Sequence, residues 1–298
     1  LDPTNPYGVI APTASGGNPY WILQHDSNMD RRSRITGFAK LQYEFTDWLS
    51  AFVRVGTDDI SQDTEAITRT GHHFFPSGRV NYGKNQRTET NYDFLLMFNK
   101  DLGEKFNLNA NVGANALRFS TISSSTRGEN IKIPGRPFLD NTENLFATQS
   151  ALVKKNVNSV YGAVSLAYDD MIYLDLTGRN DWSSALAAEN RSYFYSSASL
   201  SLLLNEAFDL GNDINLLKVR GSVASVGNDT DPQQLVNLFR IAANGFLDNV
   251  TVTRETTLFS ESLRPEDVQS TEFGLELRAF NNRFYTYQDN YWNEISSD

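Results

Sequence analysis

The sequence of 298 residues lacks cysteine, which excludes a disulfide framework, a thiolate metal site and a cysteine nucleophile. Its only three histidines leave little for acid-base catalysis. No apolar run approaches the roughly 18 residues of a transmembrane helix. Positive charge is scarce and scattered, with 26 Lys and Arg against 36 Asp and Glu, a net charge of -10. A nucleic-acid partner is therefore not expected.

Aromatic and apolar residues are nevertheless plentiful. The chain is 40% hydrophobic and 12% aromatic, yet its mean hydropathy is -0.43. The apolar share is sufficient for a packed structure, so disorder is not expected. Ring-rich segments within a chain that is polar on average suit β-strands that have one face in water.

Apolar and polar residues alternate with a period of two along several segments. From Phe106 to Ala116, apolar residues at even positions alternate with asparagines and one glycine at odd positions. Because successive side chains of a strand point to opposite faces, residues 106–117 separate an apolar from a hydrated environment. Their length of about 12 residues suffices to cross a membrane. The same alternation occurs in residues 36–45, 159–168 and 271–280.

Further strands are predicted at residues 49–56, 91–99, 171–182, 192–204, 216–225 and 283–295, which gives about ten in all. The connections alternate in length. Short turns rich in Asp, Asn or Gly are predicted at residues 46–47, 100–105, 169–170, 205–213 and 281–282, and long polar connections at 57–90, 121–156, 183–191 and 226–269. Outer-membrane barrels have tight periplasmic turns and long extracellular loops. The sequence thus predicts an all-β fold, a segment of an antiparallel transmembrane β-barrel with strands in consecutive hairpins.

Aromatic residues gather at the predicted short turns. They are Phe45, Trp48, Phe98, Phe106, Tyr168, Tyr173, Phe208, Phe280 and Phe284. Rings favour the headgroup level of a bilayer, so this placement indicates that the short turns share one membrane interface.

Several runs of residues resemble the TonB-dependent outer-membrane transporters of Bacteroidetes, of the SusC and RagA type. The resemblance is most specific at residues 158–162, 173–184, 193–201, 217–222, 225–229, 263–266 and 270–276, and it extends upstream to 18–21 and 45–49. The segment 285–298 matches the family pattern poorly. The resemblance covers nearly the whole chain.

The resemblance implies a bacterial outer-membrane location and a barrel of about 22 strands. The family's plug domain, TonB box and closing C-terminal strand are not recognised, and residues 1–4 do not begin a signal peptide. Residues 1–298 are therefore interpreted as an internal part of one barrel domain. The implied function is import of a glycan or peptide fragment, without catalysis or a cofactor. The implied partners are outer-membrane lipid, a SusD-like lipoprotein that caps the outer face, and the TonB complex, which acts through the plug.

Charged residues on the predicted wet face are the candidate site. Arg179, Asp181, Lys218 and Arg220 fall on the non-lipid face of their strands, and with Trp182 they are candidate contacts to a ligand or to the plug. The alternative interpretation is that these residues are solvated residues of the lumen.

Other motifs are weaker. His72 and His73 suggest a metal, but adjacent strand residues point to opposite faces, so a solvated loop is expected. His25-Asp26-Ser27 has the residue types of a hydrolytic triad and is expected to be a loop. Two acidic clusters could bind calcium but lack EF-hand spacing; they are Asp58, Asp59 and Asp63, and residues 228–231.

Two other functions remain open from the residues. A secreted soluble β protein could bind polysaccharide through loop aromatics such as Tyr20, Trp21 and Trp182. An outer-membrane hydrolase would require a serine, a histidine and a carboxylate to converge in space.

Overall fold

The computed structural model describes residues 18–211, 213–235, 237, 239–241, 249, 251–254 and 258–296. Residues 1–4, on which the expectation about a signal peptide rests, lie outside the described part. The elements are α1 (Pro19–His25), β1 (Ser27–Thr46), β2 (Leu49–Thr68), β3 (Arg79–Leu102), β4 (Phe106–Ile131), η1 (Leu139–Asn141), β5 (Thr142–Tyr168), β6 (Ile172–Ser183), β7 (Ser192–Leu203), α2 (Leu204–Ala207), β8 (Ile214–Asn228), β9 (Phe239–Ile241), β10 (Val252–Arg254), β11 (Glu266–Ala279) and β12 (Phe284–Ser296).

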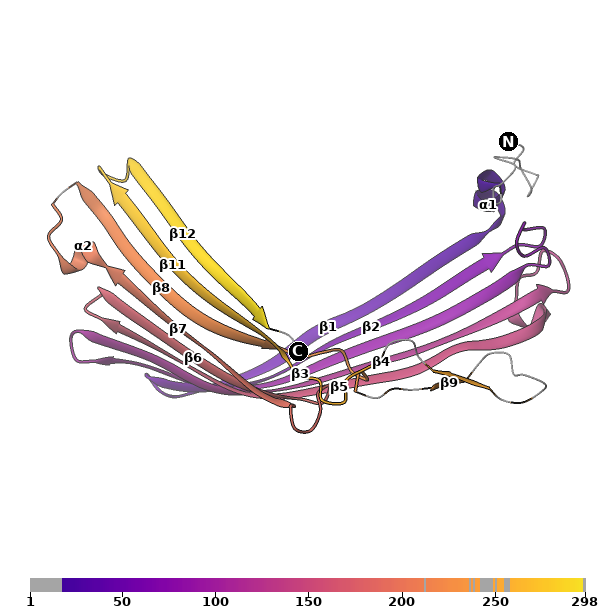
Figure 1. The fold of residues 1–298 in the computed structure, drawn as a ribbon, viewed down its shortest axis with the longest axis horizontal. Helices are drawn as coiled ribbons and strands as arrows, with labels where there is room; N and C mark the ends of the chain where they lie inside the picture. Colours follow the sequence, from indigo (N-terminus) through magenta and orange to yellow (C-terminus); the bar gives the residue numbers. More distant parts are fainter. Residues whose placement is uncertain are drawn as a thin grey trace. The chain divides into compact units, whose positions relative to one another are not determined.

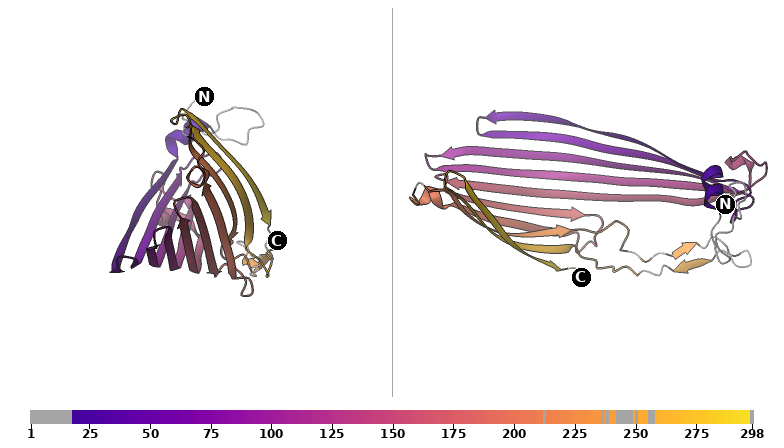
Figure 2. Two further views of the ribbon diagram at one scale, coloured as in Figure 1. Left: turned by 90° about the vertical axis from the view of Figure 1, so that its left-hand side faces the viewer. Right: turned by 90° about the horizontal axis from the view of Figure 1, so that it is seen from above.

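Ten strands form one sheet in the order β1-β2-β3-β4-β5-β6-β7-β8-β11-β12, and β9 pairs with β10 separately. Neighbours in the sheet are consecutive along the chain apart from the β9–β10 insertion, and the pairs from β5 to β12 are antiparallel. Strands β6, β7, β8, β11 and β12 lie side by side in both ribbon views (Figure 1, Figure 2). The predicted fold class, about ten antiparallel strands in consecutive hairpins, is confirmed.

The chain divides into two compact units. The first contains residues 1–37, 57–90 and 119–154, and the second contains residues 38–56, 91–118 and 155–298. The first unit has a small core of Ile67, Val80 and Ile131, against which Tyr82 and Leu139 pack. The candidate site residues all belong to the second unit.

The short turns lie where the sequence predicts them. Residues 47–48 join β1 to β2, 103–105 join β3 to β4, 169–171 join β5 to β6, and 280–283 join β11 to β12. Asp169 and Asp170 have φ angles of 50° and 55°, in the left-handed region that Asp and Asn tolerate better than most residues. Rings meet beside these turns: the centroids of Trp48 and Phe98 are 5.2 Å apart, and those of Phe106 and Tyr168 are 4.7 Å apart.

The predicted lengths of the first five strands are wrong. Residues 57–68 belong to β2, 79–90 to β3, 121–131 to β4 and 142–156 to β5, so most of the two predicted long connections is strand. The physical reason is that apolar alternation marks only the part of a strand that faces lipid. Backbone pairing continues beyond it through residues rich in Ser, Thr and charge. The connections 184–191 and 229–265 do lie between long strands, and the second contains the β9–β10 hairpin.

Two expectations about the histidines are also wrong. His25 ends helix α1, Asp26 is its C-cap and Ser27 begins β1, so these residues are not a loop. His72 does lie in the loop between β2 and β3, but it is only 7% exposed and is not solvated. Its Nδ1 accepts a hydrogen bond from the Phe74 backbone N–H at 3.1 Å, and Trp21 packs edge-on against its ring. None of the described helices is sufficiently long and apolar to span a membrane.

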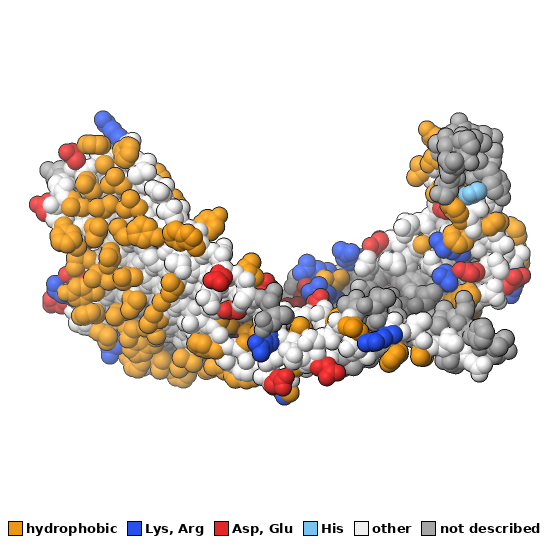
Figure 3. Space-filling view, viewed as in Figure 1, with side chains coloured by type: hydrophobic (Ala, Val, Ile, Leu, Met, Phe, Trp, Pro, Cys, Tyr) orange, Lys and Arg blue, Asp and Glu red, His pale blue; other side chains and the backbone are white. Residues whose placement is uncertain are grey.

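In the second unit the two faces of the sheet differ in polarity. One face carries large apolar residues that are exposed in the chain, among them Val160, Val164, Leu176, Phe194, Leu200, Val223 and Phe273. Hydrophobic side chains cover the sheet in the region of β6–β8, β11 and β12 in the space-filling view (Figure 3). The opposite face is rich in Ser, Thr and charged residues, as the register of β5 to β8 requires. This is the two-faced sheet of a membrane-spanning strand set.

A glycine makes room for an aromatic ring on the polar face. The Tyr161 ring of β5 lies over Gly113 of β4, where an added Cβ would lie 2.7 Å from Tyr161 Cε2. We expect Gly113→Ala to displace the ring and to lower the free energy of unfolding in lipid vesicles by about 1–3 kcal/mol, as overpacking does. Gly37→Ala is the matched control, because nothing lies within 4 Å of its added Cβ. Equal urea midpoints for the two variants would show that the Tyr161 ring does not require the missing side chain at Gly113.

Candidate functional site: a polar cluster at the loop ends of the strands

The candidate site lies on the polar face, at the end of β6 and of β8 and the start of β7, beside the middle of β5. Its rows are set by register: Asp181 lies opposite Ser159 and Tyr193, and Arg179 lies opposite Tyr161 and Tyr195. Side chains directly opposite each other in an antiparallel sheet share a face. We call the following residues the polar cluster: Lys155, Ser159, Arg179, Asp181, Ser183, Tyr195 and Asp229.

Asp181 is the buried centre of the first half of the cluster, with only 6% of its surface exposed. Its carboxylate accepts hydrogen bonds from Arg179 Nε at 2.8 Å and from the Tyr195 hydroxyl at 2.9 Å. The other side of the guanidinium donates to Ser159 Oγ at 2.8 Å. A carboxylate removed from water is costly unless it is paired and hydrogen-bonded, and both conditions hold here. The carboxylate and its guanidinium partner together therefore join β5, β6 and β7.

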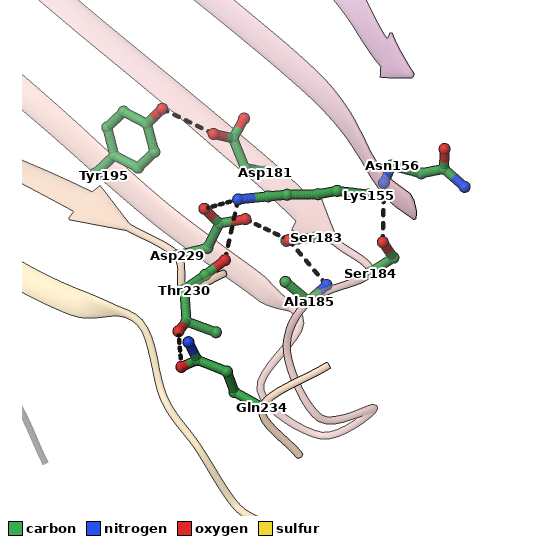
Figure 4. Close-up of polar contacts among 10 residues, drawn as sticks. All are labelled: Lys155, Asn156, Asp181, Ser183, Ser184, Ala185, Tyr195, Asp229, Thr230 and Gln234. Carbon is green, nitrogen blue, oxygen red and sulfur yellow. Dashed lines mark hydrogen bonds and ion pairs between the residues drawn. The ribbon is translucent and has the colours of Figure 1, made fainter. Parts of the chain in front are cut away.

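Asp229 is the centre of the second half, and it follows the end of β8. Lys155 Nζ donates to Asp229 Oδ1 at 2.6 Å and to the Thr230 carbonyl at 3.1 Å, while Ser183 Oγ donates to Asp229 Oδ2 (Figure 4). Ser183 also accepts the Ala185 N–H at 3.2 Å. These contacts fix the start of two loops, the one after β6 and the one after β8, against the middle of β5.

Arg220 lies in a separate group on the same face. Arg220 pairs with Ser201 and Arg179 with Tyr195 on β7, so the two arginines lie roughly 20 Å apart along the strand direction. Arg220 Nη2 contacts Asp289 Oδ2 at 2.7 Å and Glu272 Oε1 at 2.9 Å. Lys218 is opposite Leu203 on one side and Glu276 on the other.

Trp182 is on the other face of β6. It follows Asp181 in a continuous strand, so its side chain points to the apolar face, where it is 39% exposed. The structure thus brings Arg179 and Asp181 together and separates them from Lys218 and Arg220. Sequence reasoning missed Lys155, Ser183 and Tyr195. The phase of β7 could have indicated Tyr195, whereas no local signal connects Lys155 to Asp229.

The acidic clusters considered for calcium are engaged in other contacts. Asp58 binds Arg34 through two hydrogen bonds of 2.7 and 2.8 Å, and Asp59 accepts from Thr88 Oγ1 at 2.6 Å. Asp229 binds Lys155, as described above. Among the described residues, no group of three or more His, Asp and Glu side chains is arranged to hold a metal ion.

The three-residue motif at the start of β1 is likewise used structurally. His25 Nδ1 lies 2.9 Å from the Trp21 carbonyl, and the His25 ring stacks on Trp21 with centroids 4.4 Å apart. Asp26 Oδ1 accepts the Arg69 backbone N–H at 3.0 Å, and its other oxygen lies 3.6 Å from His72 Nε2. These contacts hold α1 against the loop between β2 and β3.

Comparison with known proteins finds receptors and transporters that are similar to this chain. No protein-family model matches it. A TonB-dependent receptor of Formosa agariphila is 26% identical over 215 residues, which are 69% of this chain and 22% of the receptor. The RagAB peptide transporter has a TM-score of 0.82 at 19% identity, over 94% of this chain and 32% of that chain. The siderophore receptor PiuA from Acinetobacter baumannii has a TM-score of 0.53 at 13% identity, over 89% of this chain and 40% of that chain.

These findings confirm the predicted resemblance to TonB-dependent transporters of the SusC and RagA type. They also confirm the β-barrel fold and the bacterial outer-membrane location. The relatives are receptors and transporters. The chain spans about a third or less of the length of the receptor from Formosa agariphila and of the RagAB chain.

The Lys155–Asp229 pair can be tested chemically. Asp229→Asn keeps the side-chain size but removes the charge, so we expect Lys155 to react faster with an amine-specific ester and the unfolding free energy to fall by about 1–3 kcal/mol. Exposed Lys154 supplies an internal reference for the reaction rate, measured by peptide mass spectrometry.

Asp231→Asn is the matched control, because Asp231 is exposed and only two residues away. An equal rate for Lys155 in the two variants would show that the ion pair does not hold this amine.

Proposed function

We propose that this chain forms barrel wall and extracellular loops of a TonB-dependent outer-membrane importer of large nutrients, glycan or peptide fragments. The observation that carries the proposal is the two-faced sheet. An exposed apolar face and a hydrogen-bonded polar face follow the same strands, and turns of two to four residues join β1 to β2, β3 to β4, β5 to β6 and β11 to β12. Such a sheet separates lipid from an aqueous lumen.

In this proposal residues 1–298 are part of one barrel domain whose plug and closing strand lie outside them. The plug would couple the protein to the TonB complex, and a SusD-like lipoprotein would cover the extracellular loops. The support is the likeness of the chain to the RagAB peptide transporter, a protein named for carrying peptides. The choice between a glycan and a peptide as the ligand rests on loops and plug, so both remain in the proposal.

The candidate ligand or plug contacts are Arg179, Asp181, Lys218 and Arg220. All four lie on the polar face, and Arg179, Asp181 and Arg220 are held by partners within the sheet. Fixed charges of this kind position a passing ligand without large side-chain rearrangement. Trp182 points to the lipid side and would act there as an interfacial ring.

The hydrogen bonds and ion pairs within the polar cluster support a noncatalytic role for its residues. Ser183, the serine closest to a carboxylate in the polar cluster, is buried and donates to Asp229, which Lys155 neutralises. Each group therefore satisfies a neighbour in the sheet. The proposal assigns the cluster a positioning role at the rim of the lumen.

The difference between the two faces gives a sharp test with adjacent residues. Leu176 points to lipid near the middle of β6, whereas Thr177 points to the lumen. We expect Leu176→Arg to reduce the stability of the barrel in a bilayer by about 2–4 kcal/mol, the cost of a cationic side chain at the midplane. Thr177→Arg should fold almost as the parent does. Urea titration in vesicles measures both, and similar losses in the two variants would contradict the proposed orientation.

The dependence on lipid tests the proposal as a whole. We expect the purified chain to gain β structure by circular dichroism only with detergent or lipid, and to float with vesicles, because its apolar face needs hydrocarbon. A soluble monomer that unfolds cooperatively in water would instead support a secreted protein that binds polysaccharide.

A further inference from the structure

A hollow on the sheet of the first unit is lined by charged and hydroxyl-bearing side chains. It has a volume of about 420 Å³, and its lining comes from β1, β2, β3 and β4. The residues that matter most for its chemistry are Arg31, Asp63, Lys84, Ser124 and Thr126. Sites for small molecules enclose roughly 300–1,000 Å³, so the hollow has room for one or two sugar rings.

Three charges in the hollow have no partner within the described part of the chain. The side chains of Arg31, Asp63 and Lys84 make no hydrogen bond or ion pair with any described residue, and all three are exposed. Asp181 and Asp229 of the polar cluster, by contrast, are both paired. Two cations against one carboxylate give the hollow a local positive excess in a chain of net charge -10. The hollow therefore suits an anionic group that also brings hydrogen-bond donors.

One wall of the hollow is fixed by the small core of the first unit. The Tyr82 ring packs against Ile67, Val80 and Ile131, and its hydroxyl donates to the Glu65 carboxylate. Tyr82 and Glu65 both line the hollow. Because this wall is already held by other contacts, a ligand can bind without ordering it first, which reduces the cost of binding.

The hollow opens on the outer side of the barrel wall. The apolar residues of β4 occupy the even positions from Phe106 to Ala116, and Ser124 and Thr126 continue the even positions of the same strand. Alternate side chains of a strand point to the same face. In the proposed function the even positions of β4 meet lipid, so Ser124 and Thr126 point outward beyond the lipid-facing part of the strand. A ligand in the hollow is therefore not on the import path.

We propose that this hollow binds an anionic saccharide that is anchored in the outer leaflet of the membrane. The inference rests on the proposed function, which sets the outward direction of the hollow. A phosphate or carboxylate on the sugar pairs with Arg31 and Lys84. Sugar hydroxyls both donate and accept, so they serve Asp63 and the hydroxyls of Ser124 and Thr126. The lipid anchor follows from position, because sugars linked to the outer leaflet cover the membrane on this side of the wall.

Titration of the full-length protein with lipopolysaccharide from its own host tests the proposal. The protein is reconstituted in phosphatidylcholine vesicles, and fluorescently labelled lipopolysaccharide is added. We expect Arg31→Gln with Lys84→Gln to weaken binding at least about tenfold, because two charge-assisted contacts are lost. Lys132→Gln is the matched control, since Lys132 is an exposed cation of the same unit that does not line the hollow. We expect it to bind as the parent does.

A second variant separates a shaped site from general attraction between opposite charges. Ser124→Trp fills the hollow and leaves every charge in place, and Ser124 is exposed, so the fold should tolerate the indole. We expect a loss of binding similar to that of the double variant. Parent-like binding by Ser124→Trp, or equal losses in the double variant and Lys132→Gln, would overturn the site.

Two further ligands test the chemical class and its source. The saccharide released from the same lipopolysaccharide by mild acid should bind more weakly than the intact lipid, because it has lost its anchor. Equal or tighter binding of the released saccharide would overturn the membrane source, and tighter binding of an acidic peptide would overturn the saccharide. A protein that floats with vesicles but binds no lipopolysaccharide would overturn this inference and leave the proposed function standing. A protein that does not float would overturn both.

Discussion

A strand that crosses a bilayer has no water to satisfy its backbone, so it must pair with neighbours along its whole length. The order β1 to β8, β11 and β12 follows from that requirement, since short turns of two to four residues permit only antiparallel neighbours. Pairing also sets the two faces, because opposite residues share a face in every row. Once the row of one residue is known, the environment of its partners across several strands is known as well.

Three carboxylates persist on the polar face because each is paired with a cationic side chain. Asp181 receives Arg179 and Tyr195, Asp229 receives Lys155, and Asp289 receives Arg220. Exposed ion pairs contribute little to stability, but Asp181 and Asp229 are largely buried, so the loss of one partner would leave a charge poorly solvated. The pairs therefore act mainly by fixing where each charge lies. A lumen wall that presents charges in fixed positions requires such an arrangement.

The features that are local in sequence could be predicted, and those that depend on distant residues could not. Turns at Asp169 and Asn281 and the lipid-facing phase of Leu176 follow from residue type and a period of two. The alternation of apolar and polar residues does not predict that β2 extends to Thr68, because the part of a strand beyond the bilayer needs no apolar face. Lys155 and Asp229 are 74 positions apart, and only the folded arrangement of strand β5 and the start of the loop after β8 brings them together.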